Sequence, residues 1–262
     1  MISTYNWPQA LKLSLESALR QTRLPDEILI ADDGSKSQTR ELIEDFRKST
    51  TVPIIHVWHE DQGFRLSGIR NKAISRASGD YIIQIDGDVI MEKHFIEDHL
   101  KMSNPDAFLC GSRVMLTERL SGRLLKTGLH SLRFLNLPPG SFLNSLRFRS
   151  LSKLLADRYK KNRIHSLRGC NMSFWRKDLL AINGYNESIE GWGAEDAEIA
   201  TRLINAGVRK RFLKFSGIVF HIYHKENSRA NAQQNKKILD EAVQSKKKWI
   251  PNGIIKENSY EE

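Results

Sequence analysis

Residues 81–90 have the sequence YIIQIDGDVI, in which a mostly apolar run meets two carboxylates separated by one glycine. The run 81–85 has the composition of a buried β-strand. If the backbone stays extended through Gly87, Asp86 and Asp88 lie on the same side, because side chains alternate along a strand. Carboxylate oxygens at a strand end suit Mg²⁺ or Mn²⁺. The alternative is a polar turn that closes a hairpin, since Asp-Gly is a common turn dipeptide.

The chain has 262 residues, of which 40% are hydrophobic, enough for one large α/β domain or two small ones. Cys110 and Cys170 are its only cysteines, too few for a disulfide framework or a cysteine zinc site, which fits a reducing compartment. The first residues lack the basic start and apolar run of a signal peptide, and no run of about 18 apolar residues occurs. We therefore expect a cytoplasmic protein.

The formal charge of +10 is concentrated in one segment. Residues 113–163 contain 12 Lys and Arg against 2 Asp and Glu, whereas the remainder contains 29 of each sign. The sequence thus describes an electrically balanced protein with a basic insert. A nucleic-acid-binding protein that uses this insert is one alternative, but it leaves the acidic strand ends unexplained, because carboxylates repel phosphate unless a metal intervenes. We expect no nucleic-acid partner.

Strand and helix patterns alternate along the first part of the chain. The predicted strands are 2–4, 27–31, 52–58 and 81–85, and the predicted helices are 8–21, 38–46 and 67–77. This alternation is typical of an α/β fold with an open, mainly parallel sheet and helices on both faces, which binds ligands at the carboxyl ends of its strands.

Those carboxyl ends carry polar residues: Thr4, then Asp32 and Asp33, then the pair at 86–88. Neither a dinucleotide fingerprint nor a P-loop occurs, so a nucleotide would be bound by other means. Asp32 or Asp33 is suited to accept hydrogen bonds from a base or ribose. Helix capping by Asp33 and Ser35 is the alternative.

Six segments, taken in order, resemble the inverting family-two glycosyltransferases of GT-A fold. They are STYN at 3–6, ADDGS at 31–35, RNKAI at 70–74, GDYIIQIDGD at 79–88, RGCNMSFWRKDLL at 168–180 and GWGAED at 191–196. The later part is similar to the sugar-transferring half of animal β-1,4-galactosyltransferases and bacterial chondroitin-type polymerases, which share G-W-G-x-E-D.

The resemblance implies a single GT-A domain. Its expected parts are a nucleotide-binding half at 1–112, a basic amphipathic insert at 113–165, an acceptor and catalytic half at 166–228, and a C-terminal helix with a loose tail at 229–262.

The resemblance also implies a UDP-sugar donor. The residues expected to contact it are Thr4 and Asp33 or Asp32 in the uridine pocket, Arg65 and Arg70 or Asn71 near the nucleotide or diphosphate, and Asp86 near the ribose or sugar. Departure of a diphosphate calls for a Lewis acid, and Mn²⁺ or Mg²⁺ is the expected cofactor. Its implied ligands are Asp88 and a downstream histidine, His224 or alternatively His221.

In the acceptor half, the resemblance makes Asp196 the general base, since one carboxylate that deprotonates the acceptor in a single displacement inverts the sugar. Glu195 is then expected to contact the acceptor, and Trp192, between two glycines, to stack on a sugar. The alternatives are core packing for Trp192, and a solvated helix in which Glu198 pairs with Arg202.

The insert has leucines and phenylalanines at three- and four-residue spacing with Arg and Lys between them, on both sides of Pro138, Pro139 and Gly140. This pattern predicts two amphipathic basic helices, of the kind that lie on an anionic membrane, here its inner face. The alternative is that their apolar sides pack on the catalytic domain or on a second subunit.

The expected function is transfer of a sugar from a UDP-sugar to a glycan or lipid-linked acceptor, in the synthesis of a bacterial surface polysaccharide or lipopolysaccharide. A sugar-nucleotide pyrophosphorylase is the alternative within the enzymes. It would need a Gly-rich basic loop near the N-terminus, which this sequence lacks.

Overall fold

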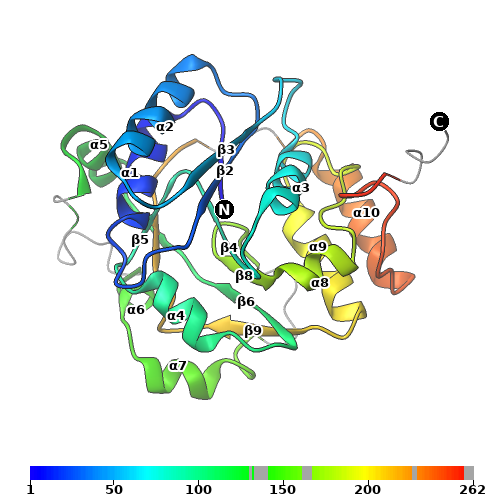
Figure 1. The fold of residues 1–262 in the computed structure, drawn as a ribbon. Helices are drawn as coiled ribbons and strands as arrows, with labels where there is room; N and C mark the ends of the chain where they lie inside the picture. The colour runs from blue at the N-terminus through cyan, green and yellow to red at the C-terminus, as the bar shows by residue number, and fades with distance from the viewer. Residues whose placement is uncertain (130–131, 133–140, 161–166, 226–228, 257–262) are drawn as a thin grey trace.

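The computed structural model describes residues 1–129, 132, 141–160, 167–225 and 229–256. Figure 1 shows a central twisted sheet with helices on both faces and a smaller sheet beside it. This architecture confirms the predicted open, mainly parallel sheet. Among the described residues, no helix combines the length and the apolar character needed to cross a bilayer.

The large sheet holds, in spatial order, β3 (Ile54–Trp58), β2 (Ile28–Asp32), β1 (Ile2–Thr4), β4 (Tyr81–Asp86), β8 (Met172–Trp175), β6 (Ala107–Gly111) and β9 (Arg209–Leu213). The first four strands are parallel to one another. β8 runs antiparallel to both of its neighbours, and β9 is parallel to β6. The carboxyl ends of β1, β2 and β4 therefore meet at one edge, as the sequence predicts.

The small sheet consists of β5 (Val89–Met91), β10 (Val219–His221) and β7 (Val114–Met115). β10 lies between the other two, antiparallel to β5 and parallel to β7. Residues 87–88 form a turn, so the chain is not extended through Gly87. Because β4 and β5 belong to different sheets, this turn does not close a hairpin, and the alternative of a hairpin turn is wrong.

Two layers of helices cover the large sheet. One layer contains α1 (Pro8–Ala18), α2 (Ser37–Ser49) and α4 (Phe95–Met102), and the other contains α3 (Leu66–Arg76), α8 (Arg176–Ala181) and α9 (Glu195–Asn205). α10 (Ala232–Gln244) packs on the outside of α9. The sequence of β2 shows why helices cover both faces of the sheet. Ile28 and Ile30 face the first layer, while Leu29 and Ala31 face the second. A strand covered on both faces needs a continuous apolar run, not an alternating one.

The pair of Glu198 and Arg202 on α9 is present, but the helix is not a solvated one. Both side chains are fully buried, with Arg202 Nε 2.7 Å from Glu198 Oε1. Arg202 also donates hydrogen bonds to the carbonyl oxygens of Ile182 and Gly184. This buried network fixes the loop before the GWGAED segment against α9, so the alternative of a solvated helix is wrong.

The insert contributes α5 (Glu118–Thr127), α6 (Phe142–Ser145) and α7 (Arg149–Leu155) to the described residues, instead of two helices. α5 packs Leu120 and Leu124 inward, and the Thr117 hydroxyl caps its first turn by accepting from the Leu120 N–H. Pro138, Pro139 and Gly140 lie outside the described residues.

The segment after α10 is packed as far as residue 256, so the tail is not loose there. The backbone N–H groups of Ile254 and Ile255 donate to the carbonyl and the side-chain oxygen of Asn183. A Cβ at Gly253 would overlap the Asn183 carbonyl, which leaves room only for glycine.

Candidate active site

Asp88, His221 and His224 form one cluster, in which one potential ligand atom from each residue lies within 4.8 Å of the others. The small sheet brings them together. Asp88 directly precedes β5, and the antiparallel register pairs Val89 with His221 at the end of β10. The chain then needs only three more residues to place His224 Nε2 3.1 Å from Asp88 Oδ2.

His224 faces Asp88 in a way that calls for a cation between them. Its Nδ1–H donates to the Lys225 carbonyl at 2.7 Å, which leaves Nε2 as the atom that faces the carboxylate. An unprotonated Nε2 and a carboxylate oxygen are both acceptors, so they repel unless a proton or a metal ion lies between them. The Asp88 hydrogen bond accordingly raises the pKa of His224, whereas burial lowers the pKa of His221.

Two atoms in this cluster are buried without a hydrogen-bond partner, Asp88 Oδ1 and His221 Nδ1. Orphaned buried polar atoms are rare in folded proteins and call for an explanation such as an ion. One carboxylate and two imidazoles are a donor set that suits a divalent metal. Among the described residues, this cluster fits the expected metal cofactor. Both histidines lie beside Asp88, although only one of them was expected to be a ligand.

Arg70 joins Asp86, two residues before Asp88, to Asp196, the expected base. Its guanidinium is almost fully buried, donating from Nη2 to Asp86 Oδ1 at 3.0 Å and from Nη1 to Asp196 Oδ1 at 3.1 Å. The Tyr185 ring lies against it, 5.2 Å from centroid to Cζ. Burial raises the pKa of Asp86 to about 6, with the charges of Asp88 and Asp196 adding to the rise and Arg70 opposing it.

Asp196 lies in the first turn of α9, where the helix dipole favours an anion. Its carboxylate packs directly against the backbone of Gly169, and a Cβ there would overlap both of its oxygens. Glu195 lies beside it with Oε2 buried and unpaired. Burial, together with the charge of Asp196, raises the pKa of Glu195 to about 7. One carboxyl group is thus held in place by Arg70, while the next takes up and releases a proton near neutral pH.

We predict that Gly169→Ala lowers turnover at least about tenfold while the protein stays folded. The new methyl group must displace the Asp196 carboxylate from Arg70, and a misplacement of about 1 Å can reduce a rate by about 10²-fold. Turnover and Mn²⁺-dependent UDP binding would be measured side by side. Gly122→Ala on α5 is the control, because nothing lies within 4 Å of its added methyl. Equal turnover in both variants would contradict the prediction.

Asp32 and Asp33 are both buried and each pairs with a histidine of the neighbouring strand region. Asp32 Oδ2 lies 2.7 Å from His56 Nε2, and Asp33 Oδ1 lies 2.6 Å from His59 Nε2. Their other oxygens accept from the backbone N–H groups of Ser35 and Arg65. Burial raises the pKa of Asp33, although the hydrogen bonds from His59 and Arg65 act to lower it. A role in binding uridine stays a prediction for either residue.

The capping alternative for this segment is wrong. α2 begins at Ser37 after Lys36, and no side chain caps that end. The Ser35 hydroxyl instead accepts from the Asn6 N–H, which joins the loop after β1 to the loop after β2. The two aspartates therefore serve the strand-end loops and not the helix.

The other predicted donor residues lie around the same edge in different environments. Thr4 is buried at the end of β1, where its carbonyl accepts from the Asp33 N–H. The half-buried Arg65 donates from Nη2 to the Glu60 carbonyl, and its Nε is buried without a partner. The amide of Asn71 is engaged with Tyr185 and Glu187. Asn71 thus positions the ring that covers Arg70, and its direct contact with a donor stays a prediction.

Trp192 is exposed, as predicted, with 42% of its surface accessible. Gly191 and Gly193 on either side have φ angles of +72° and +103°, a backbone conformation that favours glycine. The Arg229 guanidinium lies 4.9 Å from the ring centroid. Core packing is therefore excluded for this ring, while contact with a sugar stays a prediction.

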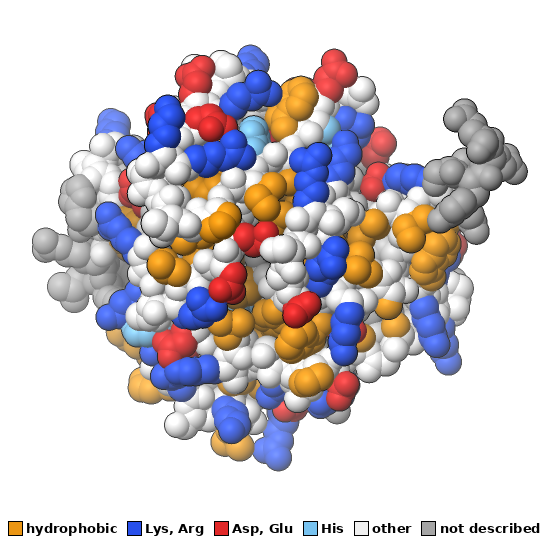
Figure 2. Space-filling view, viewed as in Figure 1, with side chains coloured by type: hydrophobic (Ala, Val, Ile, Leu, Met, Phe, Trp, Pro, Cys, Tyr) orange, Lys and Arg blue, Asp and Glu red, His pale blue; other side chains and the backbone are white. Residues whose placement is uncertain are grey.

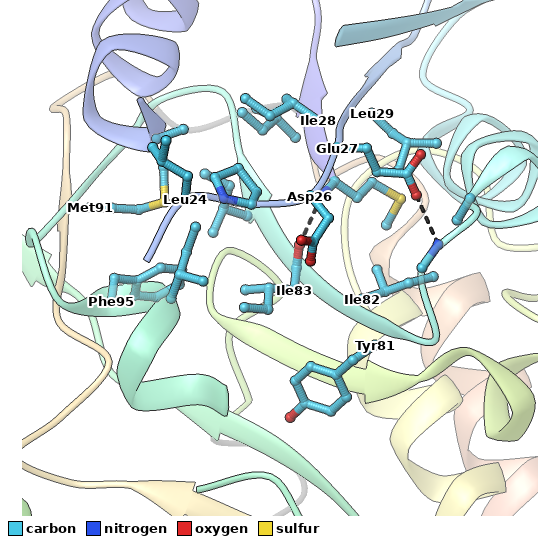
Figure 3. A pocket seen from close by; sticks show the side chains of 18 of the residues that line it. Leu24, Asp26, Glu27, Ile28, Leu29, Tyr81, Ile82, Ile83, Met91 and Phe95 are labelled. Atoms are coloured by element: carbon cyan, nitrogen blue, oxygen red, sulfur yellow. Dashed lines mark hydrogen bonds between the residues drawn. The ribbon is translucent and has the colours of Figure 1, made fainter. Parts of the chain in front are cut away.

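An apolar pocket lies at the amino ends of β1, β2 and β4, and Figure 3 shows its lining. Leu24, Met91 and Phe95 line it, and Glu27 is engaged with the backbone N–H of Gly79. Its volume of about 110 Å³ is below the roughly 300–1,000 Å³ of most ligand sites. None of the clustered carboxylates lines it, so it is separate from the candidate active site.

The sequence profile described as Glycosyl transferase family 2 matches residues 1–179. The chain belongs to this family. A second profile, described as the N-terminal domain of galactosyltransferase, matches residues 149–225, where Asp196, His221 and His224 lie. The family-two resemblance seen in the sequence is confirmed, including its second, galactosyltransferase-like part.

Curated relatives of this family-two chain are longer than it is. Chondroitin synthase from Escherichia coli is 25% identical over a 224-residue alignment that covers 79% of this chain and 32% of that protein. Validoxylamine A glucosyltransferase from Streptomyces hygroscopicus subsp. limoneus is 26% identical over a 222-residue alignment that covers 79% of this chain and 48% of that protein. The chain therefore spans less than half the length of either relative.

Solved glycosyltransferases share the fold. TarS from S. aureus, in complex with UDP, superposes with a TM-score of 0.63 at 16% identity, covering 91% of this chain and 63% of that chain. The mannosyltransferase PcManGT from Pyrobaculum calidifontis, in complex with GDP-Man and Mn²⁺, gives 0.60 at 16% identity over 86% of this chain and 56% of that chain. The predicted GT-A fold is confirmed.

Three residues of this site were not predicted from the sequence. His56 lies in β3, which pairs with β2, and His59 follows the end of β3, a spacing that is a weak signal for partners of Asp32 and Asp33. Gly169 lies within the matched RGC segment, and a glycine flanked by larger residues is a sign of close backbone approach. None of these three sequence features indicates which residue the histidine or the glycine contacts.

Proposed function

We propose that this chain transfers a sugar from a UDP-sugar to a hydroxyl group of a glycan or lipid-linked acceptor, in a metal-dependent reaction that inverts the anomeric centre. The observation that carries the proposal is the joining of two sites through one residue. Arg70 bonds Asp86, two residues from the Asp88 cluster, and also bonds Asp196. A family-two chain with a metal-ligand cluster connected to a carboxylate at a helix start has the parts that such a transfer needs.

Asp88, His221 and His224 would hold the metal ion. When bound there, it supplies a Lewis acid that stabilises the departing diphosphate. Two imidazole nitrogens favour Mn²⁺ over Mg²⁺, because Mg²⁺ strongly prefers oxygen ligands. We therefore propose Mn²⁺ as the cofactor.

Asp196 is the proposed base, and Arg70 orients it. Asp196 Oδ1 accepts a hydrogen bond from Arg70, which leaves Oδ2 for the acceptor hydroxyl. Oδ2 would take the proton of this hydroxyl as the hydroxyl oxygen attacks the sugar. Glu195, with its pKa raised to about 7, is suited to hold a second acceptor hydroxyl in either protonation state. Trp192 offers an exposed ring for an acceptor sugar.

The relatives support a glycan acceptor, since a chondroitin synthase and a hyaluronan synthase are among them. Synthesis of a bacterial surface polysaccharide or lipopolysaccharide is the pathway we propose on this basis. The pyrophosphorylase alternative is less well supported, because the sequence lacks a Gly-rich basic loop near its N-terminus. Asp86, next to the described cluster at Asp88, is instead joined through Arg70 to Asp196.

The test is a donor screen in which release of UDP from a set of UDP-sugars is measured with and without glycan acceptors. We expect acceptor-dependent UDP release that needs Mn²⁺ and stops when EDTA is added. Formation of UTP from a UDP-sugar and inorganic pyrophosphate would instead indicate a pyrophosphorylase. Equal UDP release in Mn²⁺ and in EDTA would contradict the metal-dependent mechanism.

A further inference from the structure

The segment 142–158, which contains α6 and α7, presents an apolar surface to solvent. Its exposed large hydrophobic side chains, with their accessible fractions, are Phe142 (48%), Leu143 (63%), Phe148 (53%), Leu151 (40%) and Leu154 (61%). These five residues lie within 13 positions of one another in the sequence. A concentration of this kind on one short segment marks an interaction site, unlike single scattered hydrophobic residues.

Two polar side chains of the same segment, Ser145 and Ser152, point inward. Ser145 and Ser152 are 2% and 0% accessible, and the Ser152 hydroxyl bonds the buried Ser216 hydroxyl. A helix that packs on a protein core has the opposite polarity, with its apolar stripe buried and its polar side wet. The segment therefore leaves five large apolar side chains in solvent while it buries two serines, against the preference of a water-soluble surface.

Specific bonds hold the segment in this orientation. Arg147 makes two hydrogen bonds to the buried carboxylate of Asp98 on α4, from Nε at 2.9 Å and from Nη2 at 2.6 Å. The Phe148 N–H donates to the Phe215 carbonyl at 2.9 Å, and Lys214 Nζ donates to Asn144 Oδ1 at 2.9 Å. Buried charge-assisted bonds of this kind fix one geometry. The outward apolar side is thus a fixed feature of the fold.

The charge around this apolar side is positive. Lys153 and Arg158 are exposed in the same segment, and Arg149 is 45% accessible although it contacts Glu97. The one acidic residue of the segment, Asp157, is bonded to Arg211 of β9. At the lower edge of Figure 2, where Figure 1 places α7, Lys and Arg side chains lie beside hydrophobic ones. Exposed Phe and Leu side chains flanked by Lys and Arg are the composition of segments that lie in the interface of an anionic bilayer.

We propose that residues 142–158 dock this chain on an anionic lipid surface, with Phe142, Leu143 and Leu154 entering the interface and Lys153 and Arg158 contacting lipid headgroups. Arg147 is not assigned to the lipid contact, because its Nε and Nη2 both donate to Asp98 on the protein side. The docked surface adjoins the small sheet, since α6 contacts β7, the strand beside β10 and its His221. The proposal stands independently of the reaction that the active site performs.

The test is co-sedimentation of the 262-residue chain with vesicles of phosphatidylcholine alone or with phosphatidylglycerol, at low and high salt. We expect binding to the anionic vesicles that weakens as salt rises, and little binding to the neutral ones. Lys153→Gln with Arg158→Gln should weaken partitioning roughly 30-fold, the effect of two surface charges. Leu143→Ser with Leu154→Ser should weaken it at least about tenfold.

Matched controls separate docking from loss of structure or of net charge. Lys236→Gln with Lys237→Gln removes the same charge from exposed positions on α10, and Val243→Ser changes an apolar side chain that is 47% accessible there. Both controls should bind vesicles like the parent, and all variants should keep its melting temperature.

Absence of sedimentation with anionic vesicles at low salt would overturn the proposal, as would equal binding to neutral vesicles. Unchanged binding in the Leu143→Ser, Leu154→Ser variant would overturn the assignment of the surface. A concentration-dependent dimer in sedimentation velocity that this variant abolishes, without vesicle binding by the parent, would show that the surface contacts a second copy instead.

Discussion

Asp196→Asn is expected to lower turnover by about 10²–10⁴-fold, the usual contribution of a general base, while Mn²⁺ and UDP binding stay intact. The amide keeps the size of the carboxylate, and its oxygen can still accept from Arg70 Nη1, so the packing against Gly169 is preserved. What the amide cannot do is take the proton of the acceptor hydroxyl. The loss should therefore appear in kcat and not in the affinity for donor or metal.

Turnover with saturating donor and acceptor, together with titration of UDP in Mn²⁺, checks this prediction. Asp45→Asn on α2 is the control, because Asp45 is an exposed carboxylate whose contact is a surface pair with Lys48 at 3.7 Å. Near parental turnover in the Asp196 variant would remove Asp196 from the mechanism. Loss of UDP binding in that variant would instead assign Asp196 to the donor site.

Much of the nucleotide-binding half was predictable because its strands and helices are determined by local pattern. The strand at 2–4 was predicted with the observed bounds, and those at 27–31 and 81–85 lie within one residue of β2 and β4 at each end. Helix ends were less accurate. The first helix stops at Ala18 and not at residue 21, and the Gln21 side chain beyond its end bonds the carbonyls of Ser17 and Glu92. A bond between residues as far apart in sequence as Gln21 and Glu92 leaves no local signal.

The site residues were predictable by type, whereas their partners were not. A carboxylate pair after an apolar strand and a histidine pair near position 221 both suggest metal ligands. Only the antiparallel pairing of β5 with β10 shows that both histidines meet Asp88. Arg70 lies 126 positions from Asp196, so its ion pair follows from the fold and not from sequence spacing.

The insert shows the limit of periodicity as a predictor. Leucines at helical spacing predict an amphipathic helix, and α5 buries them as expected. The same pattern in α7 leaves Leu151 and Leu154 exposed, while Arg147 and Ser152 bond Asp98 and Ser216 on the side that faces the protein. Periodicity identifies two unlike sides of a helix, but ion pairs with distant residues decide which side faces the protein.

Asp88→Ala is expected to abolish transfer and the dependence of UDP affinity on Mn²⁺. Asp88 is the carboxylate that both histidines face, at 3.1 Å from His224 Nε2 and 3.5 Å from His221 Nε2. Without it the ion would keep two neutral ligands and no negative charge from the protein, which is too little to hold a hard divalent cation. The affinity of UDP measured with Mn²⁺ should fall to its value in EDTA.

Replacing either histidine should weaken Mn²⁺ binding in the same way, but less than Asp88→Ala does. His224→Ala and His221→Ala should each weaken Mn²⁺ binding at least about tenfold, and each less than Asp88→Ala, because a neutral ligand is lost and the charge remains. His221 is 4% accessible, so the melting temperature in EDTA must be compared with that of the parent to separate ligand loss from cavity formation. His94→Ala is the matched control, since it removes an imidazole paired with Glu92 at 2.9 Å. A Mn²⁺-dependent UDP affinity in Asp88→Ala equal to that of the parent would mean that the ion, if the enzyme uses one, is held by the donor phosphates and not by this cluster.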